Sequence, residues 1–213
     1  MLSFMSFIAL VSFCIVSIVD SIASERGKSR IFKIFIVPLA LLILFFNHAM
    51  KGFFPIALVF CWLGDLFLMK NGDNYFAAGL LSFLITHILF ACHYYFVIPG
   101  WRLSIVLLAM IPYILYCFVY LKKVYIYTPH ELKFGVFLYM LSILIMSILA
   151  FVYFIETFTV LSFIEWLGTL FFILSDTLLS YQMFRHLKQK GVMPTYCMAI
   201  FLMVVAVSMN ALL

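Results

Sequence analysis

Two aspartates stand in stretches where an ionised side chain is costly. Asp65 lies within Trp62–Leu68 and Asp176 within Phe171–Leu179, and both stretches are otherwise uncharged. A charge at the centre of a membrane helix costs about 2.5–3.5 kcal/mol, so it usually serves a function or has a partner. If both carboxylates faced one cavity, desolvation and repulsion would leave one protonated and one ionised, ready for proton transfer. The other acidic residues are expected at or near loops, where water or nearby bases solvate them: Asp20, Glu25, Asp73, Glu131, Glu156 and Glu165.

His87 also lies in the middle of an apolar stretch, and helical spacing places it on one stripe with Gly79 and Phe83. It either belongs to the same site or is a buried histidine that a neighbouring helix satisfies. No His-x-x-x-His or His-Glu-x-x-His pair occurs, so the sequence contains no zinc motif of that kind. No metal and no other cofactor is predicted, and a metal held by His87 together with the aspartates remains an alternative.

The composition determines which elements position these residues. The chain has 213 residues, of which 68% are hydrophobic and 10% charged, and its mean hydropathy is +1.24. Soluble domains have about 45–50% apolar and about 25% charged residues, so the composition excludes an ordinary soluble fold. It also excludes disorder, which requires low hydrophobicity. Charge-free runs of about 20 residues match the length that crosses a bilayer. We therefore expect an all-α, polytopic integral membrane bundle, with residues 1–213 as one domain.

Eight transmembrane helices are predicted: Leu2–Ile22, Ile31–Met50, Phe53–Met69, Tyr75–Val97, Trp101–Leu121, Leu132–Phe154, Phe158–Phe184 and Pro194–Leu213. Asp65 and Asp176 fall on the third and seventh, which cross in the same direction, and both lie in the same half of the membrane. Their surroundings, Leu-Gly-Asp-x-x-Leu and Leu-Ser-Asp-x-x-Leu, are similar. This similarity is compatible with a parallel repeat of four plus four spans.

Basic residues are distributed unevenly between the two ends of these spans. Eleven of the thirteen Lys and Arg residues flank the odd-numbered loops, and only Lys51 and Arg102 lie on the other side. By the positive-inside rule the odd loops are cytoplasmic and both termini are extracytoplasmic. The bilayer accounts for the net charge of +5, so no nucleic-acid partner is expected. The short loops favour a bacterial inner membrane, or the endoplasmic reticulum in a eukaryote. No signal for an oligomeric state occurs.

The segments around both aspartates resemble the signatures of the YhhN family, the lysoplasmalogenases. Ala57–Leu68, followed by Gly79, Phe83 and Thr86–Phe90, is similar to the first signature, and Gly168–Leu179 is similar to the second. Two looser matches lie on the sixth and eighth spans: Tyr139 with Met146, and Thr195 with Tyr196. The eight short-looped spans also fit, so the resemblance covers nearly the whole chain.

The resemblance implies hydrolysis of the vinyl-ether bond of lysoplasmalogens, the 1-alkenyl-glycerophosphocholines and -ethanolamines. The products would be a fatty aldehyde and the glycerophospho-alcohol. Asp65 and Asp176 would be the catalytic acid and base, in either order. The implied supporting or substrate-binding residues are His87, Tyr139, Ser175, Tyr196 and Lys33. The single-chain lysophospholipid would enter sideways from the inner leaflet of the bilayer.

Two departures from the family pattern concern substrate contacts. The family usually has a Lys close before the Pro of the second span, whereas here Val37 precedes Pro38 and the nearest Lys is Lys33. On the eighth span a common Gln is replaced near Ile200, and the second Tyr of a pair is Cys197. These departures leave a non-catalytic homologue that binds lipid or protein as one alternative. A proton- or cation-coupled transporter using the same aspartates and a metal-dependent membrane lipid hydrolase are the others.

Overall fold

Helices make up almost the whole chain in the computed structural model, which describes residues 4–26, 32–187 and 189–212. The α-helices are α1 (Phe4–Glu25), α2 (Lys33–Phe46), α3 (Phe53–Leu68), α4 (Asp73–Val97), α5 (Leu103–Lys123), α6 (Lys133–Thr157), α7 (Val160–Phe184) and α8 (Val192–Asn210). Two 3₁₀ turns, Tyr125–Tyr127 and His130–Leu132, connect α5 to α6. In the described residues 85% are helical and none is in a strand, which confirms the predicted all-α fold.

Six helices are long and apolar enough to cross a membrane, namely α1 and α4–α8. The other two, α2 and α3, are apolar but have only 14 and 16 residues. At 1.5 Å per residue they are about 21 and 24 Å long, less than the ~30 Å hydrocarbon core. The prediction of eight full-length spans is therefore confirmed for six helices only.

The second predicted span is wrong at its end, because α2 stops at Phe46 instead of continuing to Met50. The chain turns at Asn47, and His48 adopts the left-handed conformation with φ 56°. The buried Asn47 side chain donates hydrogen bonds to Ser6 Oγ at 2.8 Å and Ser208 Oγ at 3.0 Å. A polar turn thus sits inside the protein, tied to α1 and α8, where hydropathy alone predicts more helix.

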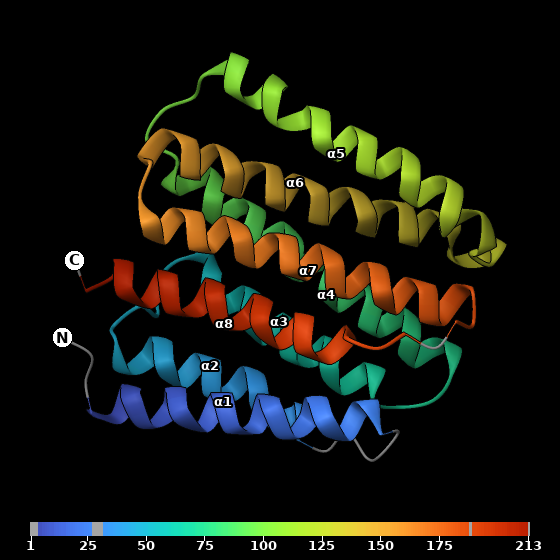
Figure 1. Ribbon diagram of the computed structural model, residues 1–213, viewed down its shortest axis with the longest axis horizontal. Helices are drawn as coiled ribbons and strands as arrows, with labels where there is room; N and C mark the ends of the chain where they lie inside the picture. The colour runs from blue at the N-terminus through green and yellow to red at the C-terminus, as the bar shows by residue number, and fades with distance from the viewer. Residues whose placement is uncertain (1–3, 27–31, 188, 213) are drawn as a thin grey trace.

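The helices pack side by side, from α5 at one edge through α6, α7 and α8 to α2 and α1, with α3 and α4 behind (Figure 1). The closest pairs are α7 with α8 and α3 with α4. Small residues allow this approach: a Cβ added at Gly168 would lie 2.6 Å from Met203 Cγ and 3.1 Å from the Ala199 carbonyl oxygen. Glycine contacts of this kind are typical of tightly packed membrane helices.

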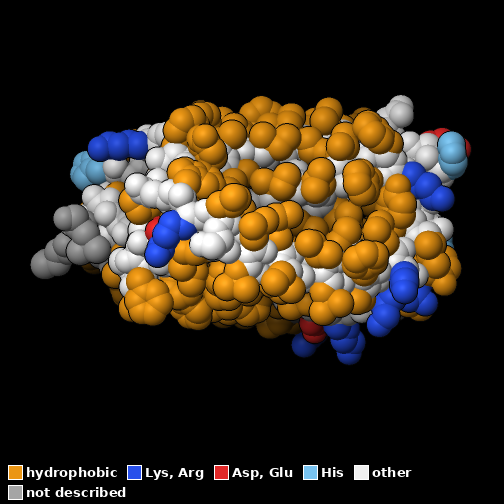
Figure 2. Space-filling view, turned by 90° about the horizontal axis from the view of Figure 1, so that it is seen from above, with side chains coloured by type: hydrophobic (Ala, Val, Ile, Leu, Met, Phe, Trp, Pro, Cys, Tyr) orange, Lys and Arg blue, Asp and Glu red, His pale blue; other side chains and the backbone are white. Residues whose placement is uncertain are grey.

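The exposed surface matches a lipid environment. Figure 2 shows apolar side chains covering the middle of the molecule, with Lys and Arg side chains gathered towards its two ends. Three residues counted in the charge argument, Lys28, Arg30 and Lys188, lie outside the described residues, as do the predicted span ends Leu2, Ile31 and Leu213. Which end faces the cytoplasm stays a prediction.

Candidate active site

Asp176 on α7 forms a compact polar cluster with residues from α4 and α6. Its Oδ2 atom accepts a hydrogen bond from the Tyr139 hydroxyl at 2.5 Å, and His87 Nε2 lies 3.5 Å from the same oxygen. His87 Nε2 is also 3.1 Å from the Tyr139 hydroxyl. The imidazole is fully buried, with Phe172 edge-on at 5.0 Å between ring centres. The three polar groups can therefore exchange hydrogen bonds within one site.

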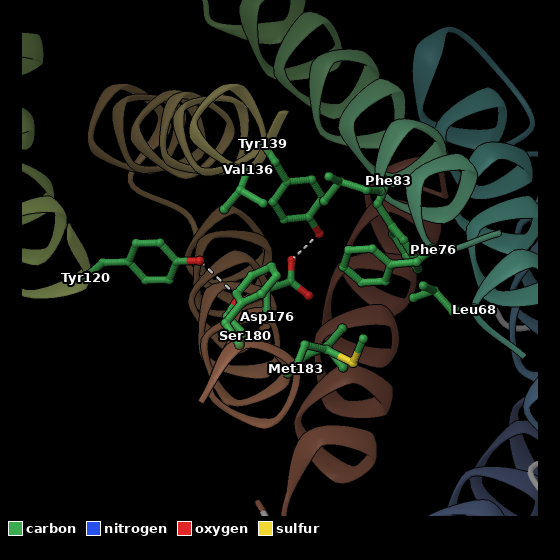
Figure 3. Close-up of a pocket in the computed structure, with 12 residues that line it drawn as sticks. Leu68, Phe76, Phe83, Tyr120, Val136, Tyr139, Asp176, Ser180 and Met183 are labelled. Carbon is green, nitrogen blue, oxygen red and sulfur yellow. Dashed lines mark hydrogen bonds between the residues drawn. The ribbon is translucent and has the colours of Figure 1, made fainter. Parts of the chain in front are cut away.

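A pocket opens directly onto Asp176, whose side chain is 15% exposed (Figure 3). Its walls are mostly apolar and come from Leu68 of α3, Phe76, Leu80 and Phe83 of α4, Val136 of α6 and Leu179, Met183 and Phe184 of α7. The polar lining residues besides Asp176 are Tyr139, Ser180 and Tyr120, and Tyr120 donates a hydrogen bond to Ser180 at 3.0 Å. The cavity volume is about 40 Å³, enough for roughly three water molecules.

Asp65 lies in a second cluster that is closed to solvent. Its Oδ1 atom forms an ion pair with Lys33 Nζ at 2.8 Å, and its Oδ2 atom accepts a hydrogen bond from the Tyr196 hydroxyl at 2.5 Å. The Lys33 ammonium also lies 5.3 Å from the centre of the Tyr196 ring. Cys61 Sγ is 3.1 Å from the Tyr196 hydroxyl. Asp65 is 0% exposed, so its charge is compensated by Lys33 and not by water.

The two clusters are neighbours that share aromatic walls. Phe172 packs edge-on against His87 of the first cluster and against Tyr196 of the second, with ring centres 5.0 and 5.6 Å apart. Within the described residues, no hydrogen bond or ion pair joins the two carboxylates. Of the two aspartates, only Asp176 lines the pocket described above. The prediction of one cavity shared by both is therefore not met by this pocket.

The remaining predicted site residues are Ser175 and Lys33. The Ser175 hydroxyl donates to the Val192 carbonyl at 3.0 Å, which ties α7 to the first residue of α8. Lys33 is among the basic residues expected at a loop, but it is only 8% exposed and pairs with Asp65. Six of the seven predicted site residues thus belong to the two clusters, and Ser175 is the exception.

Two acidic residues expected near solvent are buried instead. Asp20 is 0% and Glu165 1% exposed. Glu165 accepts a hydrogen bond from Asn210 Nδ2 at 3.2 Å, and the same amide reaches the Tyr153 hydroxyl at 3.3 Å. The expectation failed because distance from a predicted loop says nothing about which side of a helix a residue occupies. Nothing in the sequence around Asn210, at the end of α8, indicates its hydrogen bond to Glu165.

Sequence reasoning also missed a row of tyrosines on α5. Tyr113 hydrogen-bonds Ser147 Oγ at 2.8 Å, Tyr116 hydrogen-bonds Thr177 Oγ1 at 2.6 Å, and Tyr120 donates to Ser180. The spacing of three and four residues places all three on one face of α5, and this spacing was the available signal. These hydroxyls connect α5 to α6 and to the part of α7 that carries Asp176.

No group of three His, Cys, Asp or Glu side chains in the described part of the chain is arranged to hold a metal ion. The His87–Asp176 pair supplies two such groups, and Asp65 is engaged by Lys33 and Tyr196. The alternative of a metal held jointly by His87 and both aspartates therefore has no support from this geometry.

Comparison with known proteins gives a match to one protein family. No curated protein and no solved structure matches the chain. The model of the YhhN family matches residues 29–207, a range that includes both aspartates, His87, Tyr139 and Tyr196. Since this match covers most of the 213 residues, the chain belongs to the YhhN family.

Proposed function

We propose that this protein hydrolyses the vinyl-ether bond of lysoplasmalogens inside the membrane. The observation that carries the proposal is the position of Asp176. Its carboxyl group is partly exposed in a mostly apolar pocket, and the Tyr139 hydroxyl and the His87 imidazole lie within 3.5 Å of it. This arrangement suits an aliphatic substrate that needs proton transfer at one carbon atom.

The reaction requires one proton donor and one water molecule. Protonated Asp176 transfers its proton to the β-carbon of the vinyl ether, which leaves an oxocarbenium ion on the carbon bonded to oxygen. Water adds to that carbon and returns a proton to the Asp176 carboxylate. The resulting hemiacetal breaks into a fatty aldehyde and the glycerophospho-alcohol. One water molecule is consumed, and the carboxyl group is regenerated.

Tyr139 and His87 have roles that follow from their contacts with Asp176. The Tyr139 hydroxyl donates to the Asp176 carboxylate, so it stabilises the ionised form that exists after proton transfer. His87 lies against both groups and can accept or return a proton as water attacks. Both side chains are held by packed helices and not by loops, which keeps their geometry fixed.

Asp65 is the second carboxylate of the proposed mechanism, and its contribution is indirect in the free protein. It lies behind Tyr196 and Phe172 and is paired with Lys33. We assign it the task of fixing Tyr196, whose ring packs against Phe172 and Phe83. Phe83 lines the pocket, so Asp65 acts on the pocket wall. The alternative assignment, direct contact with the substrate, requires that these aromatic rings move aside.

The test is aldehyde release from lysoplasmenyl-ethanolamine and -choline in mixed micelles by purified protein. Asp176→Asn should lose at least about 10²–10⁴-fold in rate, which is the usual contribution of a general acid. Asp65→Asn should also lose activity, through displacement of Tyr196. Asp73→Asn is the matched control, because Asp73 is an exposed carboxylate in the first turn of α4.

Heavy water makes the test specific for the chemistry. In D₂O the released aldehyde should carry one deuterium on the carbon next to the carbonyl, because that carbon receives the proton from Asp176. A saturated 1-O-alkyl analogue should not be cleaved, since it has no double bond to protonate. Absence of aldehyde from folded wild-type protein would overturn the proposal and favour a lipid-binding or transport function.

A further inference from the structure

Ser180 lies about one helical turn after Asp176 and faces the same pocket. The two residues are four apart on α7, so they share one face of the helix, with Cβ atoms about 5–6 Å from each other. Both side chains line the pocket, and Figure 3 shows them next to one another, with Tyr120 reaching Ser180 from α5. A small molecule beside the Asp176 carboxyl group in this pocket therefore also lies beside the Ser180 hydroxyl.

The Ser180 hydroxyl has a proton that the protein does not use. Its oxygen accepts a hydrogen bond from the Tyr120 hydroxyl at 3.0 Å. Serine and threonine side chains within helices often donate to the carbonyl four residues earlier, as Thr177 does to Ile173 at 2.6 Å. Among the described residues, no acceptor is found for the Ser180 hydroxyl. Its O–H group is therefore available to a molecule in the pocket.

The Asp176 carboxyl group also has one oxygen atom left for such a molecule. Tyr139 donates to Oδ2, and His87 lies against the same atom, whereas Oδ1 has no hydrogen-bond partner in the described part of the chain. A water molecule with two hydrogen bonds of about 2.8 Å bridges oxygen atoms up to about 5.6 Å apart. This span suits side chains four apart on a helix, and the cavity of about 40 Å³ has room for the water.

Tyr120 determines how the Ser180 hydroxyl is oriented. A serine side chain otherwise chooses among three staggered rotamers, and its hydroxyl proton rotates freely. The buried Tyr120 hydroxyl selects the rotamer whose oxygen lies towards α5. Because Tyr120 is the donor in this hydrogen bond, the Ser180 proton must point elsewhere. The pair thus presents a donor of fixed direction at the wall of the pocket.

We propose that Ser180 is a further catalytic residue, which holds, together with Asp176 Oδ1, the water molecule that attacks the oxocarbenium ion. Tyr120 is a positioning residue that acts through Ser180. The inference rests on the proposed function. During water addition, the water oxygen bonds to the cationic carbon, and a proton of the water passes to Asp176 Oδ1. Without Ser180 the water is poorly oriented and the ion persists. The Asp176 carboxylate then takes a proton back from the neighbouring carbon, which restores the vinyl ether.

The test measures how the oxocarbenium ion divides between water addition and return to the vinyl ether. Purified full-length protein is incubated in D₂O with lysoplasmenyl-ethanolamine in mixed micelles. Water addition releases aldehyde, whereas return leaves one deuterium on the vinyl carbon β to oxygen in the unreacted lipid. Mass spectrometry gives the ratio of deuterated lipid to aldehyde within one reaction, so the ratio does not depend on the amount of folded protein. Ser180→Ala and Tyr120→Phe should raise this ratio, and slow aldehyde release, by about three- to tenfold, the usual effect of one hydrogen bond.

Tyr116→Phe is the matched control. Tyr116 makes the same kind of bridge from α5 to α7, to Thr177 at 2.6 Å, but it is not among the residues that line the pocket. This variant should keep the wild-type ratio. An equal rise in Tyr116→Phe would overturn the proposal, because the effect would then come from loosening of α5.

The same experiment separates this inference from the proposed function. Aldehyde release by the wild type, with an unchanged ratio in Ser180→Ala, would refute the role of Ser180 alone, even if that variant were slower or had a higher KM. The serine would then contribute to substrate binding or packing and not to the water step. Absence of aldehyde from folded wild-type protein would refute the proposed hydrolysis, and the role of Ser180 with it.

Discussion

Asp176 combines two properties: its side chain is partly exposed in a pocket, and it accepts a short hydrogen bond from the half-buried Tyr139. Its side chain is 15% exposed, and the Tyr139 hydroxyl lies 2.5 Å away. Asp65 accepts an equally short hydrogen bond from Tyr196, but it is fully buried and is neutralised by Lys33. The two carboxylates are similar in sequence context but have different surroundings, and different roles follow from that difference.

Removal of the Tyr139 hydroxyl should impair catalysis without unfolding the protein. Tyr139→Phe deletes the donor to Asp176 and the neighbour of His87. A hydrogen bond to a charged group contributes about 1.5–3 kcal/mol, so kcat should fall roughly 10- to 100-fold. Aldehyde release measures this effect. Tyr113→Phe removes a buried hydroxyl bonded to Ser147 and Trp166 instead, and a comparable loss of kcat there would contradict the assignment.

The buried Lys33–Asp65 pair should be costly to break and cheaper to remove. Lys33→Gln or Asp65→Asn alone leaves one uncompensated buried charge, which typically destabilises a protein by about 3–5 kcal/mol. The double variant removes both charges and should be more stable than either single variant. Thermal unfolding in detergent measures the difference. Arg102→Gln breaks a pair whose arginine side chain is 60% exposed, and should change stability by about 1 kcal/mol at most.

At the scale of helices, close packing depends on residues without side chains. The α7–α8 contact passes through Gly168, where an added Cβ would lie 3.1 Å from a backbone oxygen and 3.2 Å from the Met203 backbone nitrogen. Backbone atoms cannot rotate away as a side-chain tip can. This contact fixes the helix that carries Asp176 against the helix that carries Tyr196.

Gly168→Ala should therefore destabilise the protein, by about 1–3 kcal/mol as in other overpacked cores. The melting temperature in detergent should fall accordingly. Gly135→Ala is the control on α6, because its added Cβ would lie 3.5 Å from a Leu80 methyl group, an ordinary contact. If both alanine variants melted at the wild-type temperature, α7 and α8 would not be packed as described.

The order of the helices also bears on the predicted repeat. The two closest pairs, α3 with α4 and α7 with α8, are the pairs that a repeat of four plus four helices would place in corresponding positions. The first of each pair carries an aspartate, and its partner carries a ring that lies near an aspartate, His87 on α4 and Tyr196 on α8. The repeat stays a prediction. If it exists, each repeat of four helices contributes one aspartate and one ring to the two clusters.

At the scale of the whole molecule, the charge distribution makes a prediction about orientation. Lys51, before α3, should face the outside, whereas Lys123, at the end of α5, should face the cytoplasm. In intact cells, a membrane-impermeant maleimide should label Lys51→Cys and not Lys123→Cys. The five native cysteines all lie in helices and are buried or half-buried. They should therefore give little background labelling in the parent protein. The reverse labelling pattern would invert the proposed topology.

The sequence by itself determined the environment of this protein and the residues worth examining. Composition and apolar run length imposed helices, because only internally hydrogen-bonded segments are stable in hydrocarbon. The cost of burying charge then singled out Asp65 and Asp176. Helix ends set by polar turns escaped this reasoning, as at Asn47, because hydropathy does not register a turn buried among neighbours.

Only the tertiary structure decided how the two aspartates differ. Their contacts join residues far apart in the chain: Lys33 and Tyr196 reach Asp65 from α2 and α8, and Tyr139 reaches Asp176 from α6. Such contacts depend on how each helix is rotated about its axis. When nearly every face of a helix is apolar, the apolar pattern of the sequence does not determine that rotation. Burial of Asp20 and Glu165 has the same cause. Hydropathy thus sets the depth of a residue in the membrane, whereas packing decides which neighbours it meets there.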